Sequence, residues 1–279
     1  MTNSSSDSYS RPGIAGSGTI ASGLAASIST VSDVRLLARS DASAERARQR
    51  ILRLCERIEG SNPERVTATT DPRDLADCDL VVESVVEDLP VKIEVLRRVA
   101  AIAPDADLAS TTSSLSINEL ASLSGEQERL FGLHVFNPVP RMELVELCLP
   151  AALVPAVGHR ATAWCSTLGK TAVPVPDRAG FVVNRLLFPY LFDAVRLMEE
   201  TGLGAAEVDA CMQLGAGHPM GPLRLLDFVG LDVALAIGQN LFEVSGEDAH
   251  RPPEILARLI ADGHTGKKAG AGFYTDYRN

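Results

Sequence analysis

The chain has 279 residues, of which 46% are hydrophobic, and its formal net charge is −10 at pH 7. This size and composition fit a protein of one large or two moderate domains. No block of Lys and Arg offers the clustered positive charge that a nucleic-acid partner needs. The five cysteines are scattered without a C-x-x-C pair, which favours reduced thiols and a cytoplasmic location. The histidines also lack ligand spacing, so no metal site is expected.

The two stretches that could carry targeting or membrane signals do not have the required composition. Residues 1–10 are polar and rich in Ser, without the apolar core of a secretory signal, and we expect them to be a disordered tail. The most apolar later run, residues 181–198, is interrupted by Asn184, Arg185, Asp193 and Arg196. It is too polar to span a bilayer, so a membrane is not an expected partner.

A glycine-rich motif, G-S-G-T-I-A at residues 16–21, has the form G-x-G-x-x-A that is typical of dinucleotide-binding βαβ units. Gly16 permits a tight turn, Gly18 lets the backbone approach a pyrophosphate, and Ala21 allows close packing of helix on strand. Amides from Thr19 and Ile20 onward would face the phosphates. The motif alone is a weak signal in a region rich in small residues, and it needs the surrounding pattern.

The strand predicted at residues 33–38 bears on which nicotinamide cofactor binds. In NAD-specific sites an Asp or Glu at the end of this strand binds the ribose hydroxyls. Here the position is Ala38, and Arg39 and Ser40 follow it. An Arg beside a missing carboxylate is suited to a 2′-phosphate, so the sequence favours NADP(H). The alternative is NAD(H), with Arg39 a solvated surface charge and Asp41 on the ribose.

The remaining pattern of the first half alternates helices and strands, which predicts an α/β fold with a doubly wound parallel sheet of the Rossmann type. Ligands of such sheets bind at the carboxyl ends of the strands, where residues 83–87, 110–114 and 134–137 would lie. Helices are expected at residues 21–30, 42–58 and 90–101, and strands at 33–38, 66–69, 80–85, 108–110, 130–136 and 142–149.

His134 and Glu146 fall on two successive apolar strands of this half. A carboxylate beside a histidine fixes the imidazole tautomer and stabilises the imidazolium that forms when the ring takes a proton, so the two residue types suit a general base with its orienting partner. The alternative is a core histidine with a satisfied hydrogen bond and a glutamate at a strand edge.

The second half is predicted to be all α, with helices at residues 177–199, 205–214, 223–244 and 253–262. Its first helix is apolar nearly all round, which is typical of a helix that is central or covered by another subunit. We therefore expect a homodimer formed through this domain. Asn184 interrupts the apolar run, so it must be paired or must serve the site. The expected domains are residues 11–176 for the dinucleotide and residues 177–279 for substrate binding and dimerisation.

Taken together, the motifs resemble those of the L-3-hydroxyacyl-CoA dehydrogenases from about Gly13 to Tyr274. They are G-S-G-T-I-A-S-G, A-S-T-T-S-S-L-S-I, G-L-H-V-F-N-P-V-P, L-V-E-L, G-F-V-V-N-R-L-L, G-A-G-H-P-M-G-P-L, D-F-V-G-L-D and G-K-K-A-G-A-G-F-Y. The resemblance implies a Rossmann domain followed by a helical dimerisation domain, and hydride transfer between C3 of a 3-hydroxyacyl thioester and a nicotinamide cofactor.

The resemblance also implies roles for individual residues. His134 would be the catalytic base and Glu146 its orienting carboxylate. Ser113 would contact substrate and cofactor, and Asn184 would reach the substrate from the helical domain. The positions expected to line the cofactor cleft are Glu87, Lys92, Asn137 and Lys268, together with Ser113.

Three positions depart from the family pattern. They are the absent acid at Ala38, Thr111 where the family usually has Asn, and a short link at residues 58–64 where the family has a longer helical hairpin over the acyl-CoA. The substrate could therefore be carried by CoA or by an acyl-carrier protein, as in the branch that oxidises glyceryl-carrier protein for polyketide extender units. The same residues would also suit a dehydrogenase of a free hydroxy acid, or a catalytically silent binding protein on the same fold.

Overall fold

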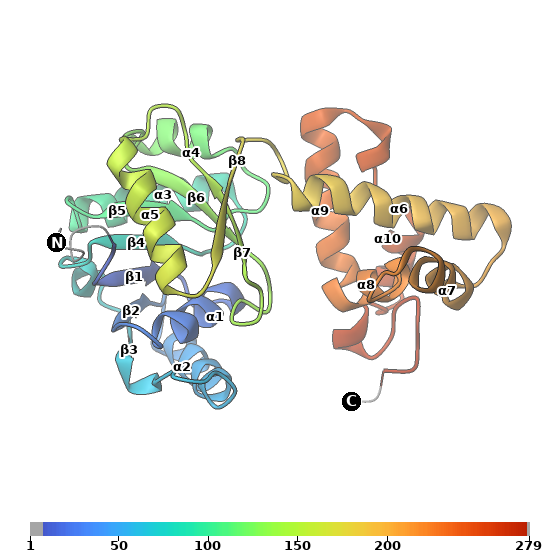
Figure 1. Ribbon diagram of the computed structural model, residues 1–279, viewed down its shortest axis with the longest axis horizontal. Coiled ribbons are helices and arrows are strands. Elements are labelled where there is room, and N and C mark those ends of the chain that lie inside the picture. The colour runs from blue at the N-terminus through green and yellow to red at the C-terminus, as the bar shows by residue number, and fades with distance from the viewer. Residues whose placement is uncertain (1–7, 278–279) are drawn as a thin grey trace. The chain divides into compact units, whose positions relative to one another are not determined.

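The computed structural model describes residues 8–277, which form two compact units. The first unit ends at Arg178 and contains one sheet with helices, and the second begins at Ala179 and is helical (Figure 1). The predicted fold class, a Rossmann-type α/β part followed by an all-α part, is confirmed.

A single sheet of eight strands forms the centre of the first unit, in the order β3-β2-β1-β4-β5-β6-β7-β8. Strands β1 to β6 pair in parallel, β7 is antiparallel to β6, and β8 is parallel to β7. The strand order reverses at β1 and β4, because β2 and β3 follow on one side of β1 and β5 and β6 follow on the far side of β4. This is the switch point where ligands of such sheets bind. The strands are β1 (Pro12–Ala15), β2 (Val34–Leu37), β3 (Val66–Thr69), β4 (Leu80–Glu83), β5 (Asp107–Ser110), β6 (Leu130–Val135), β7 (Leu144–Cys148) and β8 (Thr171–Val175).

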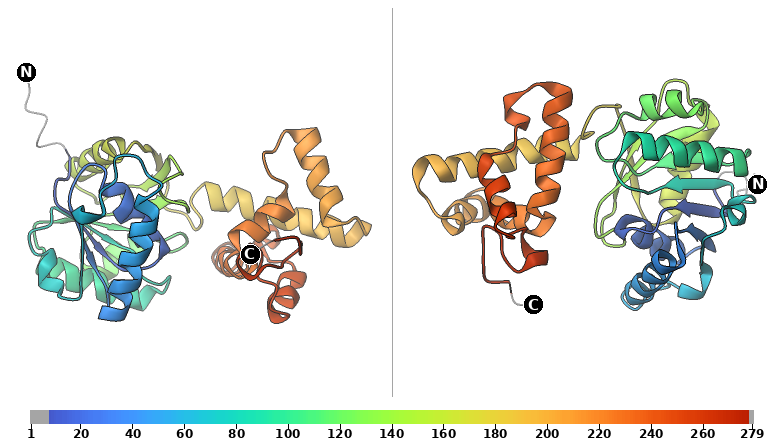
Figure 2. Two further views of the ribbon diagram at one scale, coloured as in Figure 1. Left: turned by 90° about the horizontal axis from the view of Figure 1, so that it is seen from below. Right: turned by 180° about the vertical axis from the view of Figure 1, so that it is seen from behind.

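Helices cover both faces of this sheet, as Figures 1 and 2 show. Helices α1, α2 and α5 pack into one apolar cluster with the strands, which includes Leu24, Ile51, Phe131 and Trp164. Helices α3 and α4 contact each other. The helices of this unit are α1 (Thr19–Ile28), α2 (Asp41–Cys55), α3 (Leu89–Ile102), α4 (Ile117–Ser124) and α5 (Pro155–Thr167), with 3-10 turns η1 (Pro63–Arg65) and η2 (Pro72–Leu75).

The expected disordered tail, residues 1–10, is partly corrected. Residues 1–7 lie outside the described residues. Tyr9, however, is only 6% exposed, and its hydroxyl donates to an Asp107 carboxylate oxygen at 2.7 Å. The Ser10 amide and hydroxyl both donate to Asp79. These contacts fix the chain against the sheet from Tyr9 onward, so the tail prediction is wrong for these two residues.

The second unit packs its helices around an apolar cluster that includes Phe188, Leu191, Phe192, Leu226 and Leu241. Among the described residues, no single helix is long and apolar enough to cross a bilayer, and α8 with α9 meets that criterion only as a pair bent by 97°. The elements are α6 (Val183–Thr201), α7 (Ala205–Ala216), α8 (Pro222–Val229), α9 (Leu231–Ser245), η3 (Asp248–His250), α10 (Glu254–Ala261) and η4 (Lys267–Ala269).

Two helix predictions for this part of the chain are wrong, and both errors involve positive φ angles. The helix expected from Asp177 begins only at Val183, because Gly180 (φ 74°) and Phe181 (φ 46°) adopt left-handed conformations before it. The helix expected over residues 223–244 is two helices, since Gly230 (φ 103°) ends α8 and begins α9. Asp177 instead accepts hydrogen bonds from Ser116, Ile117 and Asn118 at the start of α4.

A buried ion pair joins α3 to the carboxyl end of β4. The Lys92 ammonium donates to both carboxylate oxygens of Glu83, at 2.9 and 3.1 Å, and the two side chains are each 1% exposed. The Ser110 hydroxyl at the end of β5 donates to the same carboxylate at 2.6 Å. A buried charge of this kind is stable only when it is paired and hydrogen-bonded. This pair therefore locks the ends of two neighbouring strands and the following helix together.

Replacing Lys92 by Met should lower the free energy of unfolding by about 3–5 kcal/mol, because the Glu83 carboxylate would stay buried without its cation. The matched control is Lys268→Met in the second unit. The Lys268 pair with Asp232 is half exposed, so its loss should change stability by less than about 1 kcal/mol. Urea unfolding of both variants measures the difference, and equal losses would contradict the structural role given to Lys92.

Candidate active site

The strand pair β6 and β7 brings His134 directly opposite Glu146. The His134 Nδ1 atom lies 2.6 Å from Glu146 Oε2, and the residues are 5% and 1% exposed. The two side chains face each other because antiparallel partners of one register project to the same side of a sheet. The sequence placed both residues on neighbouring strands, and the structure shows that they form one hydrogen-bonded pair.

This pair fixes the chemical state of the imidazole. A carboxylate only accepts hydrogen bonds, so the Nδ1 atom of His134 carries a hydrogen and donates it to Glu146. The neutral ring therefore keeps its basic lone pair on Nε2. The Phe136 ring packs edge-on against the imidazole, with 4.6 Å between ring centroids. An imidazole in this state can accept a proton at Nε2, and the buried carboxylate would then stabilise the resulting cation.

The turn that follows β6 is anchored at its far end by a buried lysine. The Lys170 ammonium donates to the carbonyl oxygens of Val139 and Met142, at 2.7 and 2.9 Å. Burial lowers the pKa of Lys170. A Cβ atom on Gly23 of α1 would lie 3.0 Å from the Val139 side chain, so α1 approaches this turn closely. Asn137, which the sequence places near the cofactor, is exposed at the start of the turn.

The loop after β5 carries Ser113, and one carboxylate oxygen of Glu87 accepts several hydrogen bonds from this loop. That oxygen accepts from the hydroxyls of Thr112, Ser113 and Ser114 and from the amides of Ser113 and Ser114, at 2.7 to 3.2 Å. The Ser113 hydroxyl makes the longest of these bonds, 3.2 Å, and the Ser113 amide makes one of 2.8 Å. The backbone is therefore held firmly, while the hydroxyl can turn toward a ligand at small cost.

Glu87 is itself held by the ion pair described above, since its other oxygen lies 3.3 Å from the Lys92 ammonium. Burial acts to raise the pKa of Glu87, but Lys92 and the hydrogen bonds from Thr112, Ser113 and Ser114 outweigh it, and the pKa lies below its usual value. Glu87 stays ionised near neutral pH. The sequence predicted that Glu87 and Lys92 line the cofactor cleft, and the structure adds that their charges support the Ser113 loop.

The glycine-rich turn between β1 and α1 has the conformation that a dinucleotide requires. Gly16 has φ 142°, and a Cβ atom there would lie 2.1 Å from the Ser84 carbonyl oxygen, so only glycine fits. A Cβ atom on Gly18 would meet open space, with no other atom within 4 Å. Ala21 is fully buried under the sheet. Gly18 is the N-cap of α1 with no side-chain cap, so the first helical amides, among them those of Thr19 and Ile20, remain for a phosphate.

The segment after β2 is the one expected to meet the ribose of the cofactor. Ala38 is buried, and Arg39 is exposed. The Ser40 hydroxyl accepts from the Ser43 amide in the N-terminal cap of α2, and it also contacts the Ser43 hydroxyl. Ser40 therefore has a structural role as a helix cap. Asp41, the residue of the NAD alternative, accepts a hydrogen bond from the Thr70 hydroxyl.

Asn184 and Lys268 belong to the second unit. Asn184 is 7% exposed in the first turn of α6. The Lys268 ammonium donates to both carboxylate oxygens of Asp232, each at 2.6 Å. Ser113, Glu87 and Lys92 form one network of the first unit, and His134 with Glu146 forms another. The two networks share one edge of the sheet, because Ser110 at the end of β5 pairs with Gly132 of β6 two residues before His134.

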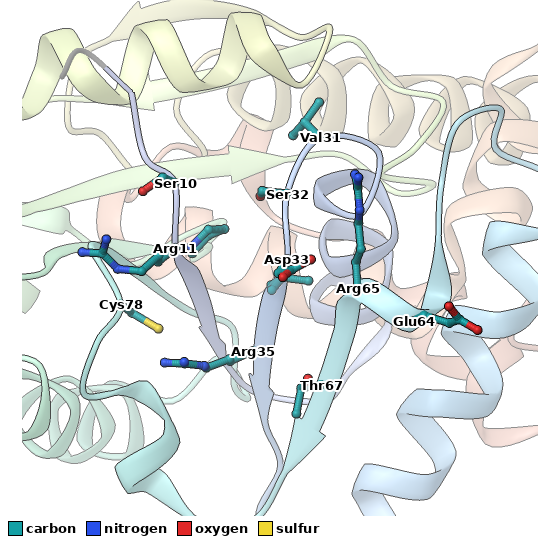
Figure 3. A pocket seen from close by; sticks show the side chains of 12 residues that line it. Ser10, Arg11, Val31, Ser32, Asp33, Arg35, Glu64, Arg65, Thr67 and Cys78 are labelled. Carbon is teal, nitrogen blue, oxygen red and sulfur yellow. The ribbon is translucent and has the colours of Figure 1, made fainter. Parts of the chain in front are cut away.

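A pocket of about 580 Å³ lies at the opposite edge, near the amino ends of β1, β2 and β3 (Figure 3). Arg11, Arg35 and Arg65 line it together with Asp33 and Glu64, so its charges are mixed. It is separate from the edge that carries His134. Within residues 8–277, no three His, Cys, Asp or Glu side chains are grouped to hold a metal ion.

Two supporting residues carry no motif, and the sequence analysis did not predict their contacts. Lys170 appears only as one lysine before a strand, and Glu83 only within the strand end at residues 83–87. Their roles are revealed by burial and by contacts. For Glu83 the available signal was that an unpaired carboxylate at the end of a buried parallel strand would be unstable and needs a partner.

Two family models and several relatives match the chain. The model of the 3-hydroxyacyl-CoA dehydrogenase NAD binding domain matches residues 12–178, and that of the C-terminal domain matches residues 180–276. The chain is 41% identical to a 3-hydroxybutyryl-CoA dehydrogenase of Mycobacterium tuberculosis, covering 97% of this chain and 99% of the relative. It is 43% identical to the human mitochondrial hydroxyacyl-coenzyme A dehydrogenase, over 70% of this chain and 63% of that protein.

A solved structure agrees with these matches. The (S)-3-hydroxybutyryl-CoA dehydrogenase of Ralstonia eutropha superposes with a TM-score of 0.89 at 32% identity, covering 98% of this chain and all of that one. The residues that the two family models match include the glycine-rich turn, the strand pair of His134 and Glu146 and the helical unit. The resemblance drawn from the motifs is thereby confirmed, and the chain belongs to the 3-hydroxyacyl-CoA dehydrogenase family.

Proposed function

We propose that this protein catalyses the reversible oxidation of a 3-hydroxyacyl-CoA to a 3-ketoacyl-CoA with a nicotinamide cofactor. The observation that carries the proposal is the buried pair of His134 and Glu146 at the ligand-binding edge of a dinucleotide-type sheet. It is supported by relatives that are named for this activity and match nearly the whole chain. A silent binding protein would have no physical need for a buried carboxylate that holds one histidine tautomer.

In the oxidation direction, His134 Nε2 takes the proton of the substrate 3-hydroxyl. Glu146 accepts the Nδ1 hydrogen bond throughout and stabilises the imidazolium. A nicotinamide cofactor held by the glycine-rich turn would supply the acceptor for the hydride of C3 in oxidation and its donor in reduction. In reduction, the imidazolium gives its proton to the 3-keto oxygen. The turn at Gly16 and Gly18 and the first amides of α1 would hold the pyrophosphate of the cofactor.

Two polar side chains are proposed to position the reacting oxygens. The Ser113 hydroxyl turns from Glu87 toward the substrate, while the Ser113 amide keeps its bond to Glu87. Asn184 is proposed to donate its amide hydrogens to the substrate from the helical unit. Donors of this kind polarise a carbonyl and keep the hydroxyl in line with the base, which is the contribution expected from pre-organised positioning.

Replacing His134 by Gln should lower kcat for acetoacetyl-CoA reduction by about 10²–10⁴-fold, the usual contribution of general acid–base catalysis. The dissociation constant of NADH should stay nearly unchanged, because the glycine-rich turn is intact. The matched control is His159→Gln on the exposed face of α5, which should leave kcat as it is. A His134→Gln enzyme that keeps most of its kcat would overturn the assignment of the base.

The same assay tests the acyl carrier. The short turn between α2 and β3, where η1 replaces a helical hairpin, raised a carrier-protein substrate as an alternative. The names of the relatives favour CoA. Acetoacetyl-CoA should therefore give a much higher kcat/KM than free acetoacetate or an acetoacetyl-carrier protein. If turnover occurs only with free acetoacetate or only with the acetoacetyl-carrier protein, the proposal that the substrate is a CoA thioester is wrong.

We further propose that NADP(H) is the preferred cofactor. The family model is described as NAD binding, which supports a nicotinamide cofactor without deciding the 2′ substituent. NADP(H) is supported by the absence of an acid at Ala38 and by the exposed guanidinium of Arg39 beside it. The helix cap engages Ser40, so the proposed 2′-phosphate partner is Arg39 rather than Ser40.

The variant Arg39→Gln should raise the KM of NADPH about tenfold, since charge-assisted hydrogen bonds to phosphate are lost, and should hardly change the KM of NADH. Initial rates with the two cofactors, side by side, measure the ratio for wild type and variant. A wild-type preference for NADH that Arg39→Gln leaves unaltered would discard the 2′-phosphate role and favour Asp41 as the ribose ligand.

The helical unit is proposed to form a homodimer. Its support is a set of exposed apolar side chains on this unit, Leu186, Leu214, Phe228 and Val244. Light scattering measures the mass directly, and a mass of one chain at micromolar concentration would contradict the dimer.

A further inference from the structure

Arg50 on α2 contacts the glycine-rich turn between β1 and α1. One Nη atom of its guanidinium donates to the Ser17 carbonyl oxygen and to the Ser22 hydroxyl, each at 3.2 Å. The Ser22 hydroxyl in turn donates to the Gly18 carbonyl oxygen at 2.8 Å. A single cationic side chain thus holds the carbonyl groups of two successive residues of the turn, Ser17 directly and Gly18 through a hydroxyl.

These contacts orient the peptide group that a phosphate would approach. Because a trans peptide places its N–H opposite its C=O, a Ser17 carbonyl drawn toward Arg50 turns the Gly18 N–H away from α2. Gly18 is exposed, and a side chain there would meet open space. The first amides of α1 lack intrahelical partners, as in any helix. Arg50 therefore helps to keep the donors of the turn pointing outward before a ligand arrives.

Among the described residues, no carboxylate neutralises the charge of Arg50. Across residues 8–277, no carboxylate forms an ion pair with it, and its two partners are a carbonyl and a hydroxyl. The first turn of α1 also contains no acidic residue. Arg50 is half-buried, so its charge is screened less than that of a fully exposed arginine. A positive charge is thus fixed beside the partial positive charge of a helix N-terminus.

We infer that Arg50 is a positioning residue for cofactor binding, which holds the glycine-rich turn in its phosphate-binding form and attracts the pyrophosphate of the dinucleotide. The inference rests on the proposed function and deepens it. Both the dinucleotide and CoA carry a diphosphate, and the contact with Ser17 and Ser22 assigns Arg50 to the dinucleotide. The diphosphate of CoA is the other source of the same chemistry, and the test separates the two.

The test uses Arg50→Gln, which keeps hydrogen-bond donors but removes the charge, and Arg50→Lys, which keeps the charge but loses the planar fork. The control is Arg53→Gln, an exposed arginine one turn later on the same helix. Dissociation constants are measured for NADH by fluorescence, and for ADP-ribose and adenosine by competition, at low and high salt. The KM of acetoacetyl-CoA and the kcat at saturating NADH are measured as well.

For Arg50→Gln, the dissociation constants of NADH and ADP-ribose should rise about tenfold, and that of adenosine should stay within about twofold. The salt dependence of NADH binding should become shallower in Arg50→Gln and persist in Arg50→Lys, which a purely structural role would not produce. The kcat at saturating NADH should be little changed, and Arg53→Gln should match the wild type in all respects.

Three results would overturn the inference. Equal weakening of adenosine and ADP-ribose would show a general distortion of the turn, and unchanged constants would show no role. An effect confined to the KM of acetoacetyl-CoA would assign Arg50 to the diphosphate of CoA. Failure of the proposed function is distinct from all three, since the wild-type chain itself would then neither bind NADH or NADPH nor turn either of them over.

Discussion

The hydrogen bond between His134 and Glu146 is the contact on which the chemistry of this fold depends, and it exists because β7 runs antiparallel to β6. A parallel strand would have needed a long crossover, whereas the turn at residues 136–143 returns the chain at once. The cross-strand register then fixes which carboxylate faces the imidazole. A slip of one residue would move Glu146 to the other face of the sheet and leave His134 without its partner.

The register of β6 and β7 matters because the Glu146 carboxylate is buried and needs a hydrogen-bond donor. Glu146 is 1% exposed, so a charge there is tolerated only with a donor directed at it. The imidazole supplies that donor in the neutral state and a full positive charge after it has taken a proton. The same principle applies a short distance away, where Lys92 neutralises Glu83 and supports Glu87, and Glu87 gathers the Ser113 loop. The buried carboxylate of Glu146 thus pre-organises the base His134. The buried carboxylate of Glu83 pre-organises Ser113 through Lys92 and Glu87.

The sequence predicted much of this arrangement because it rests on local patterns. The glycine-rich motif, the apolar parallel strands and the residues His134, Glu146 and Ser113 are all visible as spacing and residue type. The α/β class and the family followed from them. The helical unit was predicted in kind but not in its breaks. Gly230 is one glycine among many in a Gly- and Ala-rich chain, and only its positive φ shows that it separates α8 from α9.

What the sequence could not predict are contacts between residues far apart in the chain. The bond from Tyr9 to Asp107 corrected the tail, and the bonds from residues 112–114 to Glu87 show that Glu87 also supports a loop. The contact of Ser40 with Ser43, which makes Ser40 the cap of α2, is likewise visible only in the structure. Arg50 carries no motif at all, since its role depends on which face of α2 packs against α1.

The most direct test of the central claim compares the pH dependence of single-turnover hydride transfer in the two directions, for wild type and for His134→Gln. If His134 is the base in oxidation and the acid in reduction, oxidation should rise with pH and reduction should fall with pH. The His134→Gln enzyme should lose both of these pH dependences. Parallel pH dependences in the two directions, or opposite ones that persist in the Gln variant, would contradict the assignment of His134 as the proton-transferring group.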